Sequence, residues 1–528
     1  MATAPYSSAL DFRNRAALFA QLQDELFDLV VIGGGITGAG IARDAAMRGL
    51  RVALLEAQDF ASGTSSRSSK MIHGGLRYLI KGDIAVVRES VSERETLHRI
   101  APHLARKMNY IVGTRHRVEQ TIMRIALTLY EWLGQVAAND RHQRWNRQQL
   151  RCHEPELAAD KYYAAVVYPE YLTDDARLTL ANIRSARAHG ATVASYCKVT
   201  GIARSGAFEL SCQAQLPGEN SQLRVRAKAL INAAGPWVDA VAALENSAQC
   251  QRLALSRGVH LVVDHDKLPV RHSVVLAASD GRRVFAVPVG KFTYIGTTDD
   301  YYPDSDYWPP VTAADVSYLL GICAEYFPAR PLTNSDIVSA WSGIRPLIAG
   351  AEGVAAKELS RKDELWQGPL GMWTVAGGKL SAYRAMAERL VDRVVAENSF
   401  TAGGCTTASE PLPGGGELTP LSDALPAAQQ QRLQALYGSE AERVVELGGD
   451  LAAEVSFAVV VEGALRLQDY WARRSSRAWF EPAGGVASLA AAAAVMGQQL
   501  GWDAARVAAE IAECKAIDAH SREAFSDR

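Results

Sequence analysis

The first clear pattern of apolar and polar positions lies in the segment FDLVVIGGGITGAGIARDAAMRGLRVALLEAQD, residues 27–59. A continuous apolar run at residues 30–32 is typical of a buried parallel strand, and glycines follow it at once. Helical spacing of apolar residues comes next, and a second apolar run ends at Glu56. The order of strand, glycine turn, helix and strand predicts an α/β domain of the Rossmann type.

The remaining pattern divides the chain into parts. Helical periodicity dominates residues 81–160, whereas residues 251–340 are rich in strand-like alternation. The segment TTASEPLPGGGEL, residues 406–418, has the composition of a linker, and only helical spacing follows it. We therefore expect a discontinuous dinucleotide-binding domain (25–80, 160–250 and 340–400), an antiparallel-sheet substrate or cap domain (81–160 and 251–340), and a C-terminal all-α domain (419–528).

Composition narrows the class of protein. The chain has 528 residues, enough for two or three domains. Its formal net charge of -2 argues against wholesale nucleic-acid binding. Seven scattered cysteines without a CxxC pair are typical of a reduced, cytosol-facing chain with neither a disulfide framework nor a thiolate metal site. We expect no secretory signal and no membrane span, because no apolar run approaches the roughly 20 residues that a span needs.

The glycine turn has the spacing of a dinucleotide site. Gly33, Gly35 and Gly38 match GxGxxG, in which the first glycine permits the tight turn. The second lets the backbone approach a pyrophosphate, and the third lets the helix pack on the strand. Glu56 follows 23 residues after Gly33, where an acid accepts ribose hydroxyls. The loop alone does not distinguish FAD from NAD.

Three further segments place glycine or positive charge where a ligand would bind. Residues 65–79, SSRSSKMIHGGLRYL, carry three cations and a histidine but show no clean periodicity until their end. INAAGPWVD ends an apolar strand at Gly235-Pro236, at the sheet edge where α/β proteins bind ligands. AGGKLSAYR places two glycines and Lys379 at a helix start, which suits an anionic or electron-rich group.

These segments, together with DDARLTLANIRSARAHGA, RGVHLVV, YIGTTD and WSGIRPL, occur in the order found in one family. The chain resembles the FAD-dependent glycerol-3-phosphate dehydrogenases of the aerobic, respiratory type. The resemblance covers about residues 25–400 and continues more weakly to the C-terminus. The chain departs from the family pattern at Ala234, where threonine is usual, at Arg67, where a small residue is usual, and in a shortened loop before SRKDEL.

The resemblance implies a fold of the glutathione-reductase or amino-acid-oxidase type and non-covalent binding of FAD. It also implies oxidation of sn-glycerol 3-phosphate to dihydroxyacetone phosphate by hydride transfer to FAD, with the electrons passed to a membrane quinone. The residues expected at the cofactor are Gly33, Gly35, Gly38, Glu56, Ser65, Ser66, Lys70, His73, Gly74, Gly75, Gly235, Gly378 and Lys379.

The substrate implied by the resemblance is a phosphate dianion, which requires arginine forks and lysine charges. The residues expected to bind it are Arg77, Tyr78, Arg345, Arg361 and Lys379. His260 is expected to act as general base or to orient the substrate, and Arg345 to favour an alkoxide-like transition state by its fixed charge. We assign His73 to the backbone turn and rank it below His260.

Three alternatives remain open from sequence alone. An oxidase on the same fold would pass electrons to O₂, and an amine-oxidising flavoprotein would share the glycine-rich elements. A flavin-bearing sensor would bind FAD without turnover.

The resemblance to a respiratory enzyme also predicts peripheral attachment to the inner face of the cytoplasmic membrane. We expect an anionic membrane surface to bind residues 115–151, where an apolar helix precedes Arg141, Arg144, Arg147 and Arg151 at helical spacing. WARRSSRAWF, residues 471–480, is the weaker candidate, because Trp471 and Trp479 are expected to pack inside the helical domain. A homodimer is a further possibility that the sequence leaves open.

Overall fold

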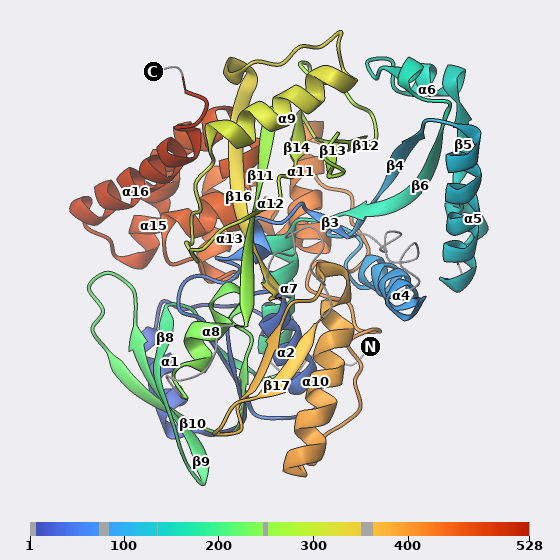
Figure 1. Ribbon diagram of the computed structural model, residues 1–528. Coiled ribbons are helices and arrows are strands. Elements are labelled where there is room, and N and C mark those ends of the chain that lie inside the picture. Colours follow the sequence, from blue (N-terminus) through green and yellow to red (C-terminus); the bar gives the residue numbers. More distant parts are fainter. Residues whose placement is uncertain (1–6, 73–83, 135, 246–251, 350–362, 527–528) are drawn as a thin grey trace.

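The computed structural model describes residues 7–72, 84–134, 136–245, 252–349 and 363–526. Figure 1 shows two sheets, one below and one above the centre of the molecule, with the C-terminal helices beside the upper sheet.

The first sheet has at its centre the parallel strands that the opening pattern predicts. β1 pairs in parallel with β2 on one side and with β10 on the other. The strand order is β17-β18-β10-β1-β2-β7, and the β8–β9 hairpin extends from β10. The strands are β1 (Leu26–Ile32), β2 (Val52–Leu55), β7 (Thr192–Ala194), β8 (Cys197–Ser205), β9 (Ala207–Ala214), β10 (Gln222–Asn232), β17 (Glu364–Gln367) and β18 (Trp373–Ala376).

Both faces of this sheet are covered, which explains the unbroken apolar run in β1. Three helices pack on the face that contains Val31: α2 (Ile36–Met47), α7 (Asp175–Ala188) and α10 (Tyr383–Asn398). The helix α1 (Arg15–Asp24) and the β8–β9 hairpin pack on the opposite face, which contains Val30.

The second sheet is antiparallel except where β12 runs parallel to β4. Its order is β15-β11-β14-β13-β12-β4-β6-β3, with β16 paired to β11 and β5 to β6. The strands are β3 (Met71–Ile72), β4 (Arg106–Thr114), β5 (Gln143–Asn146), β6 (Ala164–Leu172), β11 (Leu253–Asp264), β12 (Ser273–Ala277), β13 (Arg283–Val289), β14 (Phe292–Gly296), β15 (Asp300–Tyr301) and β16 (Ile337–Ile348). The associated helices are α4 (Ile84–Ile100), α5 (Arg117–Leu133), α6 (Arg147–His153) and α9 (Ala313–Tyr326), whereas α8 (Val238–Ala242) packs on β10 and β18 of the first sheet.

The predicted fold class, an α/β domain with an antiparallel-rich second sheet and a helical C-terminal part, is confirmed. The sheets nevertheless divide the chain differently from the expected ranges. β6 and most of β16 fall within 160–250 and 340–400, yet both belong to the second sheet. Strand periodicity shows which residues are buried but not which neighbour they pair with, so it does not fix the sheet to which a strand belongs.

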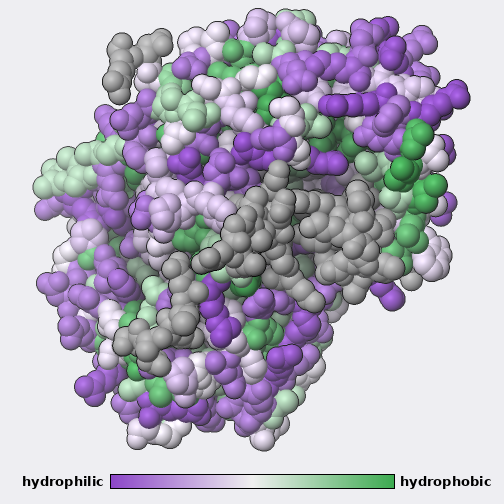
Figure 2. Space-filling model, viewed as in Figure 1, coloured by the Kyte–Doolittle hydropathy of each residue, from purple (hydrophilic) through white to green (hydrophobic). Residues whose placement is uncertain are grey.

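The helix α5 has one exposed apolar face. Its inner side chains, including Met123 and Leu127, are buried in the core. A stripe at spacings of four and three residues is exposed instead, and Figure 2 shows it as a green band on the side where Figure 1 places α5. We call this the α5 stripe; its residues are Val118 (67% exposed), Ile122 (61%), Ile125 (64%), Leu129 (40%) and Trp132 (74%).

Residues 141–151 do not form the basic helical face that their spacing predicts. Arg144 lies in strand β5, and only from Arg147 does the chain become helical. Trp145 is buried and stacks on His153 at a ring-centroid distance of 4.1 Å. Packing of this tryptophan against the second sheet therefore overrides the helical spacing of the arginines.

The C-terminal part contains only helices in residues 419–526, all of which the structure describes. They are α11 (Ala427–Tyr437), α12 (Ala441–Glu446), α13 (Leu451–Val460), α14 (Arg477–Phe480), α15 (Leu489–Leu500) and α16 (Ala504–Arg522), with short 3-10 turns and a π-helical turn at Asp469–Arg474. Trp471 and Trp479 are buried, and Trp479 also packs against Trp341 of β16 at a ring-centroid distance of 6.0 Å.

The π-helical turn joins this part to the cofactor half of the first sheet through buried charges. Asp59, three residues after Glu56, accepts hydrogen bonds from Arg473 Nε at 2.5 Å and from Arg474 Nη2 at 2.8 Å. Asp469 accepts from Arg473 Nη2 at 2.7 Å and from the Tyr196 hydroxyl at 2.7 Å. Burial raises the pKa of Asp59, but the two arginines outweigh it, so its pKa lies below the ordinary value. We call Asp59, Asp469, Arg473 and Arg474 the ionic junction.

We predict that Asp59→Asn destabilises the protein by about 3 kcal/mol, because it leaves two buried guanidinium groups without their shared anion. Urea denaturation followed by tryptophan fluorescence measures the loss. Asp11→Asn is the matched control, since Asp11 pairs with Arg13 on the exposed surface and its loss costs about 1 kcal/mol or less. Equal shifts of the urea midpoint in both variants would contradict a structural role for the ionic junction.

Candidate active site

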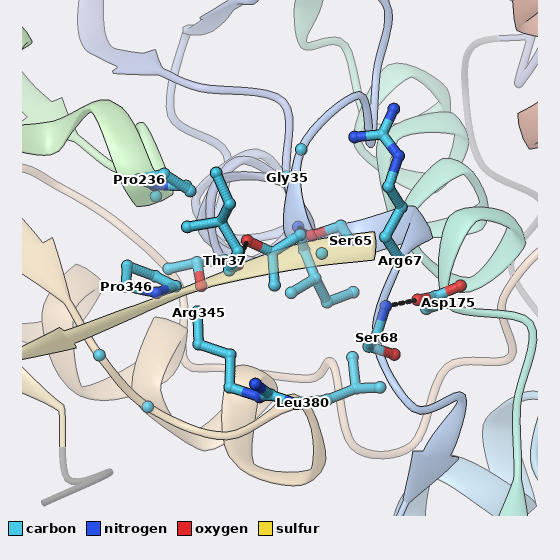
Figure 3. Close-up of a pocket in the computed structure, with 18 of the residues that line it drawn as sticks. Gly35, Thr37, Ser65, Arg67, Ser68, Asp175, Pro236, Arg345, Pro346 and Leu380 are labelled. Carbon is cyan, nitrogen blue, oxygen red and sulfur yellow. Dashed lines mark hydrogen bonds between the residues drawn. The ribbon is translucent and has the colours of Figure 1, made fainter. Parts of the chain in front are cut away.

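A cavity of about 1070 Å³ lies at the carboxyl ends of the parallel strands, where the first sheet faces the second. Residues that follow β1, β2, β10 and β18 line one side, and residues of β16 line another. Figure 3 shows Gly35, Ser65, Pro236, Arg345 and Leu380 around this space. The position is the one at which open α/β sheets bind ligands.

The glycine turn packs against neighbouring backbone too closely for a side chain to fit. A Cβ added to Gly33, whose φ is +112°, would lie 2.5 Å from the carbonyl oxygen of Ala233. One added to Gly38 would lie 1.9 Å from the carbonyl oxygen of Gly33. α2 begins after Gly35, and its Ile36 N–H donates to Ser65 Oγ at 2.9 Å. This cradle, with a helix N-terminus open to the cavity, fits the pyrophosphate of a dinucleotide.

Glu56 lies on the cavity wall at the end of β2. Its carboxylate accepts the Gly34 N–H at 2.7 Å and the Gln58 N–H at 2.8 Å. Burial raises the pKa of Glu56, although these two hydrogen bonds oppose the rise. The backbone thus holds the carboxylate in place beside the cradle, where it can accept ribose hydroxyls.

The other glycine-bearing segments reach the same cavity. Gly235 follows β10 with φ +56°, and Gly378 precedes α10 with φ +86°. Both line the cavity, as does Lys379, whose Nζ lies 3.4 Å from Ser90 Oγ. Three segments far apart in sequence therefore converge on one space, as the motifs predict.

Arg345 extends from β16 into the cavity region. Its Nη2 donates to Thr297 Oγ1 at 2.9 Å, and its Nη1 lies 3.3 Å from Asp299 Oδ1. A Cβ at Gly258 on the neighbouring strand would lie 2.2 Å from the guanidinium, so the glycine makes space for it. Both Nη atoms also lie 3.4 Å from the Thr298 carbonyl oxygen, and these contacts together hold the guanidinium at the cavity wall.

His260 lies behind the cavity wall rather than on it. It is 1% exposed, stacks on Trp341 at a centroid distance of 4.7 Å, and bonds through Nε2 to Ser69 Oγ at 2.9 Å. Its Nδ1 has no hydrogen-bond partner among the described residues. Burial lowers the pKa of His260 well below its ordinary value, and Arg345 and Lys70 lower it further. The imidazole is therefore neutral and able to accept a proton, and Ser69 separates it from the cavity.

Two expected cofactor residues lie outside the lining. Lys70 Nζ donates to Asp175 Oδ1 at 2.6 Å and to the Ser66 carbonyl at 3.1 Å, and all three residues are buried. Neither Ser66 nor Lys70 lines the cavity, whereas Ser65 does. Lys70 instead holds Asp175, a cavity residue at the start of α7 that sequence reasoning missed. The sequence feature that could have indicated Asp175 is the pair of adjacent acids in DDARLTL at the start of a helix.

Six expected site residues lie outside the described residues: His73, Gly74, Gly75, Arg77, Tyr78 and Arg361. Their roles stay predictions from the resemblance. Of the cations predicted to bind the substrate, the described structure places Arg345 and Lys379 at the cavity.

Comparison with known proteins places the chain in a family. A model of FAD-dependent oxidoreductases matches residues 28–393, and one for the C-terminal domain of alpha-glycerophosphate oxidase matches residues 405–507. The chain is 36% identical to the aerobic glycerol-3-phosphate dehydrogenase of Staphylococcus haemolyticus over 508 residues, 89% of this chain and 90% of the relative. It is 38% identical to that of Staphylococcus aureus over 424 residues, 77% of this chain and 74% of the relative.

Comparison with solved structures supports the same family assignment. The glycerol-3-phosphate dehydrogenase from Bacillus halodurans, complexed with FAD, superimposes with a TM-score of 0.80 at 30% identity, covering 98% of this chain and 99% of the other. An L-alpha-glycerophosphate oxidase from Mycoplasma pneumoniae shares the fold at 17% identity and a TM-score of 0.55. The resemblance drawn from the motifs is confirmed, and the chain belongs to the family of FAD-dependent aerobic glycerol-3-phosphate dehydrogenases.

Proposed function

We propose that this protein oxidises sn-glycerol 3-phosphate to dihydroxyacetone phosphate by hydride transfer to FAD and passes the electrons to a membrane quinone. The observation that carries the proposal is one cavity that joins a dinucleotide cradle to a cationic wall. An enzyme of this kind needs a site for FAD, a clamp for the phosphate dianion and a base for the hydroxyl proton.

FAD supplies the hydride acceptor of the reaction. The cradle of Gly33 and Gly35 holds its pyrophosphate against the N-terminus of α2, and Glu56 accepts its ribose hydroxyls. Gly235, Gly378 and Lys379 line the rest of the same cavity and bind the remainder of the cofactor.

The phosphate of the substrate binds at Arg345 and Lys379, with Arg77, Tyr78 and Arg361 completing the clamp as the family resemblance implies. His260 takes the hydroxyl proton. Ser69 lies between His260 and the cavity, so the proton reaches Nε2 through the Ser69 hydroxyl. The fixed charge of Arg345 stabilises negative charge that develops on the substrate oxygen.

The α5 stripe supports attachment to a membrane surface. No helix among the described residues is long and apolar enough to cross a bilayer. The stripe instead offers five apolar side chains, with Arg115, Arg117 and Arg124 exposed beside them. Apolar insertion and cations near anionic lipids together suffice for peripheral binding. The 471–480 alternative is not supported, because Arg473 and Arg474 are buried in the ionic junction.

The same helix connects that surface to the site. Met123, on the buried side of α5, lines the cavity together with Val112, Val275 and Phe285. This apolar section favours a lipid-soluble quinone as acceptor and entry from the α5 side. Homodimer formation stays a prediction.

We expect anaerobic addition of sn-glycerol 3-phosphate to bleach the visible flavin band of the purified protein, since hydride transfer reduces the flavin. The absorption spectrum measures this directly. Rapid peroxide release in air, with poor reduction of a quinone analogue, would favour an oxidase instead. A flavin band that glycerol 3-phosphate leaves unchanged would exclude the proposed substrate.

Arg345→Gln is expected to lower kcat/KM for glycerol 3-phosphate at least tenfold, because a charge-assisted contact in a closed site contributes about 1.5–3 kcal/mol. Arg224→Gln, on the exposed edge of β10, is the matched control and leaves kcat/KM unchanged. Wild-type kcat/KM in Arg345→Gln, with flavin content intact, rules out this part of the clamp.

The same variant tests the charge state of His260. Because the pKa of His260 is depressed, its neutral form persists as pH falls below 6.5, so kcat should decline only at still lower pH. Arg345 contributes to that depression, and its removal should raise the pKa and move the acid limb of the kcat profile to higher pH. If the acid limb lies at the same pH in both enzymes, it does not report the protonation of His260.

The membrane proposal predicts that Ile122→Ser/Ile125→Ser/Trp132→Ser weakens binding to anionic phospholipid vesicles at least tenfold, because apolar area no longer leaves water. Vesicle sedimentation measures binding, and flavin bleaching by glycerol 3-phosphate should stay normal. Leu418→Ser/Leu447→Ser, which removes exposed apolar residues from the C-terminal part, is the control. Equal vesicle binding by both variants would place the docking surface elsewhere.

A further inference from the structure

The connection between β15 and α9, residues 302–312, forms neither helix nor strand and contributes Tyr307 to the cavity wall. We call it the strap. It is anchored at both ends: the Tyr302 N–H donates to the Leu255 carbonyl at 3.0 Å, and Arg257 Nη1 donates to the Pro310 carbonyl at 3.0 Å. The anchors lie on β11 of the second sheet, yet Tyr307 of the strap lies on the wall of the cofactor cavity.

Tyr307 contributes an aromatic surface to that wall. Its ring stacks on Trp237 at a centroid distance of 4.4 Å and an interplanar angle of 27°, and both residues line the cavity. A Cβ at Gly63 would lie 2.8 Å from the Trp237 ring, so the cofactor loop closes tightly on this pair. Burial raises the pKa of Tyr307, and the negative charge of Glu56 raises it further. The pair therefore lies beside the carboxylate that accepts ribose hydroxyls.

Trp308 packs against Arg67, which also lines the cavity. The guanidinium carbon of Arg67 lies 3.9 Å from the centroid of the Trp308 ring, and Nη1 donates to the Ser62 carbonyl at 2.8 Å. Arg67 is 4% exposed and lines the cavity. Its Nε has no hydrogen-bond partner among the described residues, and no carboxylate there lies within ion-pair distance. Burial, and then Arg473, lower the pKa of Arg67 to about 9.

A buried cation with so little compensation is costly unless an anion completes its surroundings. Arg67 is two residues from Ser65, which bonds the first N–H of α2 at the pyrophosphate cradle. The stacked aromatic pair thus lies next to Glu56, and Arg67 lies next to the glycine turn. Together they cover the two chemical parts of an adenosine diphosphate group, an aromatic base with its ribose and a pyrophosphate.

We propose that the strap is part of the FAD site: Tyr307 and Trp237 pack against the adenosine of FAD, and Trp308 holds Arg67 towards its pyrophosphate. The proposal rests on the FAD chemistry of the proposed function and assigns residues of the second sheet to cofactor retention.

The test measures FAD release from the holoenzyme. After dilution, dissociation is followed by the rise in fluorescence of free FAD. Tyr307→Ala should release FAD about tenfold faster or more, because a stacking surface is lost, whereas Tyr307→Phe retains the ring and should behave like wild type. Arg67→Met should also accelerate release. Tyr301→Ala, an exposed tyrosine adjoining the strap, is the matched control and should have no effect.

A second measurement locates the contact on the cofactor. After removal of the flavin, Tyr307→Ala should weaken binding of ADP and of FAD by the same factor and leave FMN binding unchanged. Equal weakening of FMN and FAD would place the strap at the flavin half and overturn the proposal. So would release of FAD from Tyr307→Ala at the wild-type rate. These two outcomes would overturn the role of the strap but not the proposed function. The proposed function would be contradicted by a purified protein that neither carries nor takes up FAD.

Discussion

The ionic junction at Asp59 is the interaction on which the arrangement of the site depends. Asp59 lies on the loop that leaves β2, three residues beyond the ribose acid, and its two arginines come from the π-helical turn of the C-terminal part. Separating buried charges from their counterions is costly, so the turn and the loop cannot move apart independently. The C-terminal helices thus act on the site without lining the cavity, by fixing the loop that carries Glu56.

The pairing of buried charges also explains the chemistry of the cavity wall. Lys70 is paired with Asp175, and Arg345 lies near Asp299, whereas Arg67 relies on an aromatic ring and a carbonyl. Burial, then Arg345 on the wall and Lys70 behind it, lower the pKa of His260, so this buried histidine stays neutral. A wall of this kind attracts a phosphate dianion and at the same time keeps a base in its proton-accepting form. One set of charges therefore serves both binding and proton transfer.

Local patterns predicted the parts of the site that depend on neighbours in sequence. The strand, turn and helix around Gly33 follow from spacing alone, and the convergence of Gly235, Gly378 and Lys379 follows from strand ends that meet at one edge. Features set by distant packing were not predictable. Trp145 is buried against the second sheet and makes a strand of residues that have helical spacing, and β6 joins that sheet rather than the first. Lys70 was expected at the cofactor, yet its partner Asp175 lies 105 positions away and draws it behind the wall.

The strap shows why some residues of a site carry no signal in sequence. Tyr307 and Trp308 lie in a segment without periodicity, and neither belongs to a dinucleotide motif. Their position follows from two anchors on β11 and from the space that Gly63 leaves opposite Trp237. Closure of the cofactor site is therefore a property of the contact between the two sheets. A cofactor held from both sheets is also a link between them: the first sheet supplies the cradle, and the second supplies Arg345 and the strap. Binding free energy that retains FAD thereby also stabilises the orientation in which the cationic wall faces it.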